Sequence, residues 1–551
     1  MSGVRTRIHP EFLAPVAAII LVLFYNQPLW GHLNEILGGG NDALALRLGF
    51  GAMLWAIFSL VLLALSTPRL LKPVLVGLFL CSAASLYFMQ QYGTLFDRDM
   101  LRNVVQTDAS EVRDLLSWKL FAYLLLLGVL PSVLLYKLPL ARHGSALRGV
   151  LSRVGVAAVA FSVLLGVALA QYQGLASLLR NHHELRLLAV PSNYLSAAYG
   201  FARDSLVSDT KPWQTIGEDA HRSSAWQQHH RPSLTVLVIG ESARADHFGV
   251  LGYPRDTTPE LAHEAGLLTF PQVTSCGTET AVSVPCMFSR MNRSDYKAAV
   301  AEHQDGLLDI LQRSGLKVTW LDNQSGCKGA CDRVEHQSLR DAKDSSFCAD
   351  GECHDVILVD GLQRYLNDLQ GDNVLVLHQM GSHGPDYFKR YPQAFQRFSP
   401  ICASNALNDC SQQDIINAYD NTISYTDHVL ASAIDILRTQ SNRLDTGLIY
   451  LSDHGESLGE FNLYLHGTPY ALAPPQQTHI PMLMWFSDGY RQEFGLDQDC
   501  LRDASGQAYS QDNLFHSMLG LLQVETREYQ RSLDLFANCR QPSGMLAKEG
   551  K

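Results

Sequence analysis

The chain has 551 residues, a hydrophobic content of 47%, a formal net charge of −11 and a mean hydropathy of −0.01. The hydrophobic content excludes a disordered chain, and the acidic balance argues against a general nucleic-acid binder. The charge is unevenly distributed, because residues 1–171 hold 13 Lys and Arg against 8 Asp and Glu, a net charge of +5, whereas residues 172–551 have a net charge of −16. The length and this division exclude a single uniform domain.

Five apolar runs near the N-terminus are almost free of charged residues. Each is close to the roughly 20 residues that a helix needs to cross a bilayer. Five such runs in succession leave no polar faces to cover them, which disfavours a set of buried soluble helices. We therefore predict that residues 1–172 form a five-helix transmembrane domain whose partner is the lipid bilayer. The runs are 12–30, 46–66, 73–91, 118–138 and 154–172.

Basic residues in the short loops orient these spans. They precede the first run, join the second to the third and join the fourth to the fifth, which are the cytoplasmic sides by the positive-inside rule. With an odd number of spans, the chain after residue 172 is expected outside the cytoplasm. The loop between the third and fourth runs carries three arginines as well, together with five acidic residues. The orienting residues are Arg5, Arg7, Arg69, Lys72, Lys137, Arg142 and Arg148.

Within that loop, valines and leucines of residues 103–116 interleave with charges. Such a pattern is typical of an amphipathic helix on a membrane surface. A plain connecting helix explains it equally well, and the sequence leaves both interpretations open.

Ten of the 11 cysteines follow residue 275, and the other, Cys81, lies in the third run. An even number confined to the exported part predicts a disulfide framework. The spacings 327–331 and 348–353 would also suit a zinc site, but an oxidising compartment favours disulfides. We predict pairing between neighbours: Cys276 with Cys286, Cys327 with Cys331, Cys348 with Cys353, Cys402 with Cys410, and Cys500 with Cys539.

Residues 173–232 are interpreted as a partly helical bridge, with a helix at 175–188 that ends before Pro191. From residue 233 to 551, short apolar runs alternate with helical stretches, which indicates an α/β domain with a largely parallel, buried central sheet. The expected strands are 234–239, 318–321, 374–377, 448–451 and 482–485, and the expected helices are 306–314, 356–369 and 414–437.

Polar residues follow three of these strands. Glu241 comes after the first, His378 and His383 after the third, and Asp453 and His454 after the fourth. Ligands of α/β folds bind at the carboxyl ends of the strands. Carboxylate and imidazole ligands suit Zn²⁺. The sequence therefore predicts a zinc site at this edge of the sheet.

A candidate nucleophile lies in the loop 275–283, which leads into a predicted helix. A hydroxyl at a helix N-terminus, such as that of a threonine in this loop, faces backbone N–H groups that favour an anion. Coordination to a metal would lower the pKa of this hydroxyl. On the local sequence alone, N-capping of the helix is the simpler role for the threonine.

Taken together, these motifs resemble the phosphoethanolamine transferases of Gram-negative inner membranes, in the alkaline phosphatase and sulfatase superfamily. The likeness is greatest to the lipid A phosphoethanolamine transferases, which include the mobile colistin-resistance enzymes. It extends over nearly the whole chain, and the five-span anchor also fits. The matching stretches are VLVIGESARADHFGVLGYPRDTTPEL, SCGTETAVSVPCMFSR, LDNQSGCKGACDRV, VLHQMGSHGPDYFKRYP, YDNTISYTDHVL and IYLSDHGESLGEFNLYLHGTPYALAP.

The resemblance implies an alkaline phosphatase-like fold for residues 233–551 and a zinc site. The zinc ligands of the family are a glutamate, the nucleophilic threonine, and an adjacent aspartate and histidine. They correspond to Glu241, Thr280, Asp453 and His454. One Zn²⁺ is expected to be tightly held, and a second zinc is left open.

The resemblance also implies residues that contact the substrate. His383 and His466 correspond to two histidines that lie at the substrate phosphate or at a second zinc. Lys328, with Gln324 and Ser325 beside it, corresponds to the group implicated in holding phosphoethanolamine. A lysine and two histidines would add positive charge or protons at a phosphoryl group.

The activity implied by the resemblance is transfer of phosphoethanolamine from phosphatidylethanolamine to a phosphate of lipid A. The transfer would pass through a covalent phosphoethanolamine–threonine intermediate and confer resistance to polymyxin. The chain would lie in the Gram-negative inner membrane as a monomer, with its catalytic domain in the periplasm and without a nucleic-acid partner. Alternatives are a core oligosaccharide or other surface glycan as acceptor, a phosphoglycerol transferase, and a membrane-anchored phosphodiesterase.

Overall fold

The structure is a computed structural model that describes residues 7–107, 109–208, 211–340, 346–349 and 352–540. It divides into two compact units. The first comprises Met1–Leu101 and Leu116–Gly200, and the second comprises Arg102–Leu115 and Phe201–Lys551. The chain therefore passes between the units three times. Residues 102–115, from the loop between two predicted spans, fold with the second unit, and the last division lies at residue 200 where the sequence analysis places a bridge.

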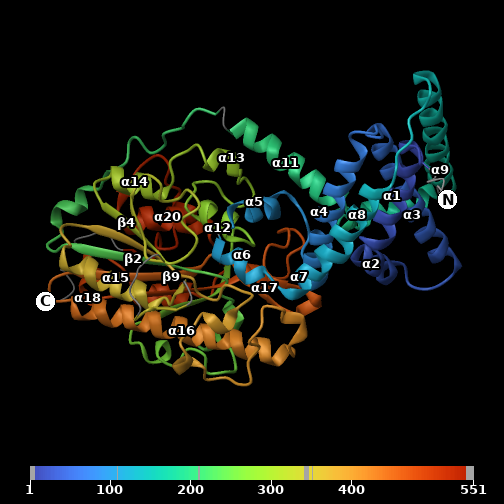
Figure 1. The fold of residues 1–551 in the computed structure, drawn as a ribbon. Helices are drawn as coiled ribbons and strands as arrows, with labels where there is room; N and C mark the ends of the chain where they lie inside the picture. The colour runs from blue at the N-terminus through green and yellow to red at the C-terminus, as the bar shows by residue number, and fades with distance from the viewer. Residues whose placement is uncertain (1–6, 108, 209–210, 341–345, 350–351, 541–551) are drawn as a thin grey trace. The chain divides into compact units, whose positions relative to one another are not determined.

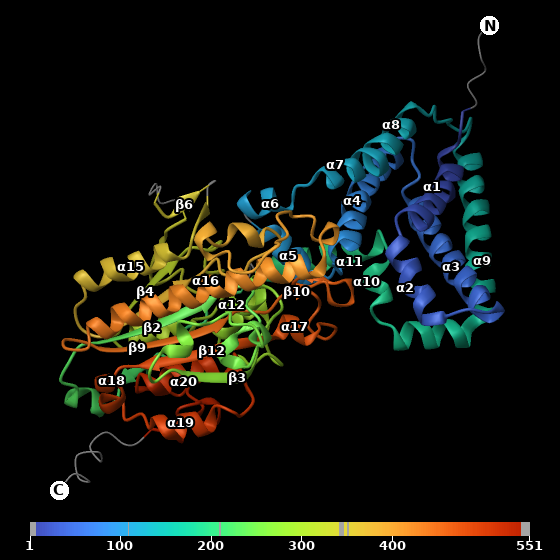
Figure 2. The ribbon, with the colours of Figure 1, turned by 90° about the horizontal axis from the view of Figure 1, so that it is seen from below.

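The first unit is helical. Four helical segments are long and apolar enough to cross a membrane, and a fifth span results if the bent pair α1 and α2 counts as one. Helices α1, α3 and α9 lie side by side (Figure 2). The helices are α1 Pro10–Phe24, α2 Gln27–Leu37, α3 Asn41–Ala64, α4 Leu71–Tyr92, α7 Trp118–Tyr123, the π-helical turn η1 Leu124–Val129, α8 Leu130–Lys137, α9 Ala146–Asn181, α10 Leu185–Leu188 and α11 Ser192–Ser208.

The first predicted span is bent by 63° between α1 and α2, so the run 12–30 is divided between two helices and is not one continuous helix. The side chain of Asn26 is fully buried at the bend, and its Nδ2 donates to Leu21 O at 2.9 Å and to Val190 O at 2.8 Å. Its Oδ1 accepts from Val190 N at 2.8 Å. Pro28, at the start of α2, has no N–H to satisfy. The amide thus supplies partners for backbone groups that a bend in an apolar unit would otherwise leave unpaired.

A mixed eight-stranded sheet forms the centre of the second unit. Its strand order is β13-β3-β12-β9-β2-β8-β4-β5. All neighbouring strands are parallel except that β12 runs antiparallel to both β3 and β9. The predicted parallel arrangement is therefore correct except for this strand. The bounds are β2 Ser233–Gly240, β3 Leu268–Thr274, β4 Lys317–Asp322, β5 Glu335–Ser338, β8 Asn373–His378, β9 Asp445–Ser452, β12 His479–Phe486 and β13 Tyr509–Ser510.

Helices cover both faces of this sheet, as Figure 1 shows for α14 and α20 on one side and α15 and α16 on the other. Strand β2 is buried along its whole length. Its Leu237 and Ile239 pack in the core beside α14 and α20, whereas its Val236 and Val238 pack in the core beside α15 and α16. Burial on both faces explains why the strand reads as a continuous apolar run. The helices are α14 Leu307–Arg313, α15 Val356–Asn367, α16 Gln412–Thr439 and α20 Asp512–Leu521.

All five predicted disulfides are present in the second unit. The loop segment 103–116 contains two short helices in place of the single predicted helix, because α5 ends at Gln106 and α6 begins at Ala109. The remaining elements are α5 Arg98–Gln106, α6 Ala109–Leu115, β1 His221–Arg222, α12 Thr280–Met287, α13 Ala298–Ala301, β6 Cys348–Ala349, β7 Glu352–Cys353, β10 Ser457–Leu458, β11 Tyr464–Leu465, α17 Pro475–Thr478, α18 Asp488–Glu493, α19 Gln498–Ala504 and β14 Val524–Glu525.

Candidate active site

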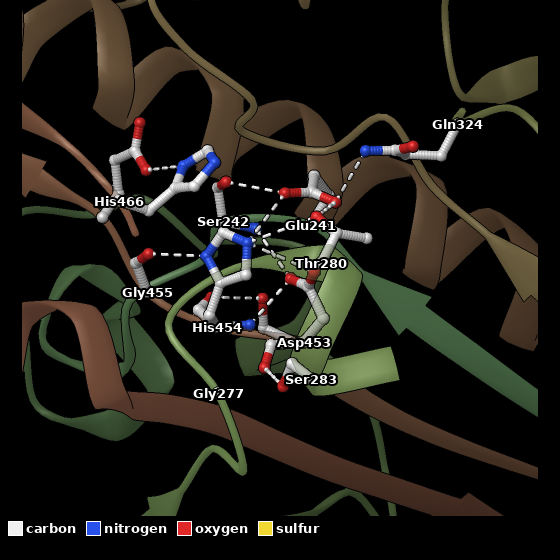
Figure 3. Close-up of polar contacts among 12 residues, drawn as sticks. Glu241, Ser242, Gly277, Thr280, Ser283, Gln324, Asp453, His454, Gly455 and His466 are labelled. Atoms are coloured by element: carbon white, nitrogen blue, oxygen red, sulfur yellow. Dashed lines mark hydrogen bonds and ion pairs between the residues drawn. The ribbon is translucent and has the colours of Figure 1, made fainter. Parts of the chain in front are cut away.

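Three buried side chains meet at the carboxyl ends of β2 and β9. Glu241 follows β2, and Asp453 and His454 follow β9, the parallel neighbour of β2. One ligand atom from each side chain lies within 4.8 Å of the other two, and all three residues are fully buried. Figure 3 shows that they point toward one another. The structure thus brings together the carboxylates and the imidazole that the sequence analysis places in one metal site.

The carboxylate of Glu241 is held by three neighbours. Its Oε1 accepts from Ser242 Oγ at 2.8 Å, and its Oε2 accepts from Thr280 Oγ1 at 3.0 Å and from Gln324 Nε2 at 2.8 Å. The backbone beside it leaves no room for a side chain on Gly381, where a Cβ would lie 2.7 Å from Glu241 O and 2.9 Å from Glu241 N. Gly381 also has φ = +53°, a conformation that favours glycine. The glycine therefore lets the chain after β8 approach the backbone of Glu241 closely.

Asp453 and His454 are oriented as a cation site requires. Asp453 Oδ1 accepts from Ser242 N at 3.1 Å and from His454 N at 2.7 Å, whereas its Oδ2 is buried without a hydrogen-bond partner. His454 Nδ1 donates to Gly455 O at 2.9 Å, which turns Nε2 toward Glu241 Oε1 and Asp453 Oδ2, each at 3.3 Å. Histidines that bind metals usually donate their other ring N–H to a carbonyl or carboxylate oxygen, which fixes the orientation of the ring. These residues therefore fit a divalent cation.

The electrostatics of the three groups support the same conclusion. Burial and the charge of Glu241 raise the pKa of Asp453 above its usual value. Burial opposes protonation of His454, but the charge of Asp453 and the contact with Glu241 outweigh it and raise the pKa of His454. A bound divalent cation would supply the positive charge that the two carboxylates require.

Thr280 is the first residue of α12 and is nearly buried. Glu279, with φ −153° and ψ 149°, occupies the N-cap position. The Thr280 hydroxyl donates to Glu241 Oε2, and its Oγ1 lies 3.4 Å from His454 Nε2. Because the hydroxyl points into the carboxylate cluster, N-capping does not explain the threonine. Farther along the helix, Ser283 Oγ contacts Asp453 O, which ties α12 to the end of β9.

Two further histidines adjoin the cluster. The ring of His466 lies 4.4 Å from the ring of His454 and 5.5 Å from that of His383, between centroids. His466 Nδ1 is 2.8 Å from Glu456 Oε2. The Nδ1 of His383 has no hydrogen-bond partner, and burial lowers the pKa of His383 to about 4. The structure thus gathers the four predicted zinc ligands and both predicted substrate histidines around one point.

The loop after β4 brings the other predicted residues to the edge of the site. Gln324 contacts Glu241 directly, whereas Lys328 Nζ donates to Ser325 Oγ at 2.8 Å and to Ser325 O at 3.1 Å. Ser325 and Lys328 line a cavity of about 390 Å³, to which Gln106 of α5 also contributes. Lys328 thus lines a cavity formed mainly by the loop after β4, and Gln324 of the same loop contacts Glu241.

Sequence comparisons identify relatives of the whole chain. A family model described as "Sulfatase" matches residues 233–524, and one described as "Phosphoethanolamine transferase EptA/EptB" matches residues 54–206. "Phosphoethanolamine transferase EptA" of Escherichia coli (strain K12) is 43% identical over 91% of this chain and 92% of its own length. "Phosphatidylethanolamine transferase Mcr-1" of Escherichia coli is 37% identical over 87% of this chain and 90% of its own length.

A structural comparison extends over both units. The structure of "Integral membrane protein lipooligosaccharide phosphoethanolamine transferase A (EptA) from Neisseria meningitidis" matches with a TM-score of 0.94 at 37% identity, and the match covers 98% of this chain and 100% of that one. This chain belongs to the phosphoethanolamine transferase family. This family is part of the alkaline phosphatase and sulfatase superfamily, which accords with the match of residues 233–524 to the "Sulfatase" model.

The transferase site also contains residues that the sequence analysis did not single out. Glu456 binds His466, and Arg390 Nε donates to His383 O at 2.7 Å. Asp322 Oδ1 is 2.6 Å from Nδ1 of the buried His378. Glu456 lies two residues after His454, so its place in the same motif could have indicated that it belongs to the site. Nothing in the local sequence indicates the partners of Arg390 or Asp322, because these pairings join distant segments.

Proposed function

We propose that this transferase moves phosphoethanolamine from phosphatidylethanolamine to a phosphate of lipid A, with Thr280 as the nucleophile. The observation that carries the proposal is the position of Thr280 Oγ1, 3.0 Å from Glu241 Oε2 and 3.4 Å from His454 Nε2 in a buried cluster. A hydroxyl in such surroundings is placed to lose its proton and attack an electrophile.

Zn²⁺ is the proposed cofactor. Glu241, Asp453 and His454, together with Thr280, would hold it. When bound, zinc lowers the pKa of a coordinated hydroxyl and neutralises charge on phosphoryl oxygens. The buried Asp453 Oδ2, which has no hydrogen-bond partner and faces His454 Nε2, supports this assignment.

In the first proposed step, Thr280 Oγ attacks the phosphorus of phosphatidylethanolamine. The bond between phosphorus and the glycerol oxygen breaks, and diacylglycerol leaves with a proton on that oxygen. The Thr280 proton passes to Glu241 Oε2, to which the hydroxyl is hydrogen-bonded. A histidine beside the cluster, His383 or His466 with its Glu456 partner, relays a proton to the glycerol oxygen. Thr280 then carries the phosphoethanolamine, while Lys328 with Ser325 and Gln324 binds its head group.

In the second step, a phosphate oxygen of lipid A attacks the same phosphorus, and the bond to Thr280 Oγ breaks. The threonine recovers its proton, so the enzyme returns to its starting state.

Both substrates are lipids, which accords with a membrane unit in the same chain as the site. We infer an inner-membrane enzyme whose catalytic unit lies in the periplasm, where disulfides form. Adding phosphoethanolamine lowers the negative charge of lipid A, so cells that carry the enzyme should resist polymyxin.

The test compares wild type, Thr280→Ala and Thr280→Ser with phosphatidylethanolamine and purified lipid A. We expect wild type to add one phosphoethanolamine to lipid A, Thr280→Ala to add none, and mass spectrometry to find a phosphoethanolamine adduct on the wild-type Thr280 peptide. Normal transfer by Thr280→Ala would refute the nucleophile assignment. Modified core sugar with unmodified lipid A phosphates would refute the acceptor, and release of free phosphoethanolamine would indicate a hydrolase.

A further inference from the structure

The segment Arg102–Leu115 lies in the sequence between two membrane-spanning helices, yet it folds as part of the catalytic unit. Its Asp114, in α6, is buried. Asn405 Nδ2 donates to the backbone oxygen of Asp114 at 2.8 Å, which fixes the main chain at this point. A buried carboxylate at the end of such a segment needs cationic partners.

Two consecutive cations of the catalytic unit supply them. Asp114 Oδ1 accepts from Lys389 Nζ at 2.8 Å, and Asp114 Oδ2 accepts from Arg390 Nη2 at 2.8 Å. The side chains of Asp114 and Arg390 are 7% and 2% exposed. Burial alone would raise the pKa of Asp114, but the charges of Arg390 and Lys389 outweigh burial and lower the pKa. The carboxylate is therefore ionised and paired, not exposed to solvent.

Arg390 connects this contact to the active site. Its guanidinium donates to three different segments: Nη2 to Asp114, Nη1 to Glu352, and Nε to the backbone oxygen of His383 at 2.7 Å. A guanidinium is planar and rigid, so two carboxylates that hold its Nη atoms also determine where Nε lies. The place of the His383 carbonyl therefore depends on both carboxylates.

Packing alone does not hold the guanidinium in place. A cavity of about 400 Å³ adjoins it and is lined by Arg113, Lys389, Arg390 and other residues. Atoms beside a cavity have fewer van der Waals contacts that resist displacement. On this side of Arg390, the polar contacts to Asp114 and Glu352 therefore add to the restraint that packing supplies.

We infer that Asp114 and Arg390 are positioning residues for His383, so that head-group transfer depends on a segment inserted between two membrane spans. The inference rests on the proposed function, because it assumes that His383 acts on the substrate phosphate. Neither residue touches the reacting atoms. Their effect is to set the backbone of His383, and errors of about 1 Å in such placement lower rates by up to about 100-fold.

The test uses the full-length enzyme with a fluorescent phosphatidylethanolamine and purified lipid A. Asp114→Asn is expected to lower kcat by about 10- to 100-fold with little change in KM for the donor. Asp114→Glu should recover part of kcat, whereas Arg390→Lys, which has no planar fork, should lower it as Asp114→Asn does. Hydrogen exchange should become faster in the peptide 380–390. The matched control is Asp435→Asn, a carboxylate 65% exposed and paired with Arg438, which should behave as wild type.

Several outcomes would overturn the inference. Wild-type kcat in Asp114→Asn and Arg390→Lys would do so, and so would a lower kcat with unchanged exchange in 380–390. An increase in KM that accounts for the whole loss would show a binding role instead. The exchange measurement needs no activity, so it remains decisive if Thr280→Ala still transfers the head group and the proposed function fails. Conversely, loss of transfer in Thr280→Ala with unaltered Asp114→Asn would refute the inference alone.

Discussion

The membrane unit and the catalytic unit differ most in how many charged residues they bury. Among the described residues, Glu11 is the single Asp, Glu, Lys or Arg buried in the membrane unit. The catalytic unit buries many, including Glu241, Asp453 and Arg390. A buried charge is costly unless it is paired. The catalytic unit offsets this cost with ion pairs and gains a site that can hold a cation and bind phosphate, whereas the membrane unit relies on apolar packing and a few buried amides.

The largest expected effect is at the buried carboxylates. Glu241→Gln should lower the transfer rate by about 10³-fold or more, because it removes both a proposed zinc ligand and the acceptor for the Thr280 hydroxyl. Transfer assays and zinc content per chain check this expectation. The control is Asp488→Asn, whose side chain is 85% exposed, and it should retain activity and metal. Full zinc content and activity in Glu241→Gln would contradict the view that the buried charges of the catalytic unit form a cation site.

Removal of two different disulfides should affect the stability and the activity of the catalytic unit to different extents. Closing the loop between Cys500 and Cys539, with a sequence separation of 39, is worth about 4 kcal/mol, and closing that between Cys327 and Cys331, with a separation of 4, about 2 kcal/mol. Replacing Cys500 and Cys539 by serine should therefore lower the free energy of unfolding more than replacing Cys327 and Cys331 by serine.

Replacing Cys327 and Cys331 should instead lower activity more, because they flank Lys328. Thermal unfolding and transfer assays on both double variants measure the two effects. Equal loss of activity in the two variants would contradict a special role for the loop that carries Lys328.

In the membrane unit, the bend between α1 and α2 should also contribute to stability, but less than the disulfide between Cys500 and Cys539. Asn26→Leu removes three hydrogen bonds to backbone groups of Leu21 and Val190, so the free energy of unfolding should fall by about 1–3 kcal/mol. Unfolding in a denaturing detergent measures it. Asn34→Leu, on the same α2 helix, serves as the control. Wild-type stability in Asn26→Leu would show that the bend does not depend on this amide.

Exposed ion pairs should have the smallest effect. Arg502 and Asp499 are 59% and 89% exposed and lie 2.7 Å apart. Arg502→Ala should change the free energy of unfolding by less than about 1 kcal/mol, because solvent screens such a pair. Chemical denaturation of the full chain measures the change. A loss well above about 1 kcal/mol would contradict the view that burial, and not charge alone, gives ion pairs their effect here.

Local patterns predicted much of this fold. Strands β2, β8 and β9 were found because parallel strands buried on both faces read as continuous apolar runs. The reversed direction of β12 was not predictable from its composition, since direction depends on the path of the connection before it. Strand β3 was missed because only part of it is buried, so its apolar pattern is weaker.

The sequence by itself indicated the five apolar runs, the four closely spaced cysteine pairs, and the motifs that contain the glutamate, threonine, aspartate and histidine that the structure brings together. Each is expressed within a short segment, through hydrophobic length, close spacing or a strand-end motif. The tertiary structure alone decided that Asn26 binds Val190 and that Asp114 joins the catalytic unit through Arg390. These contacts join residues 164 and 276 positions apart, and their stability comes from burial that exists only once the chain has folded.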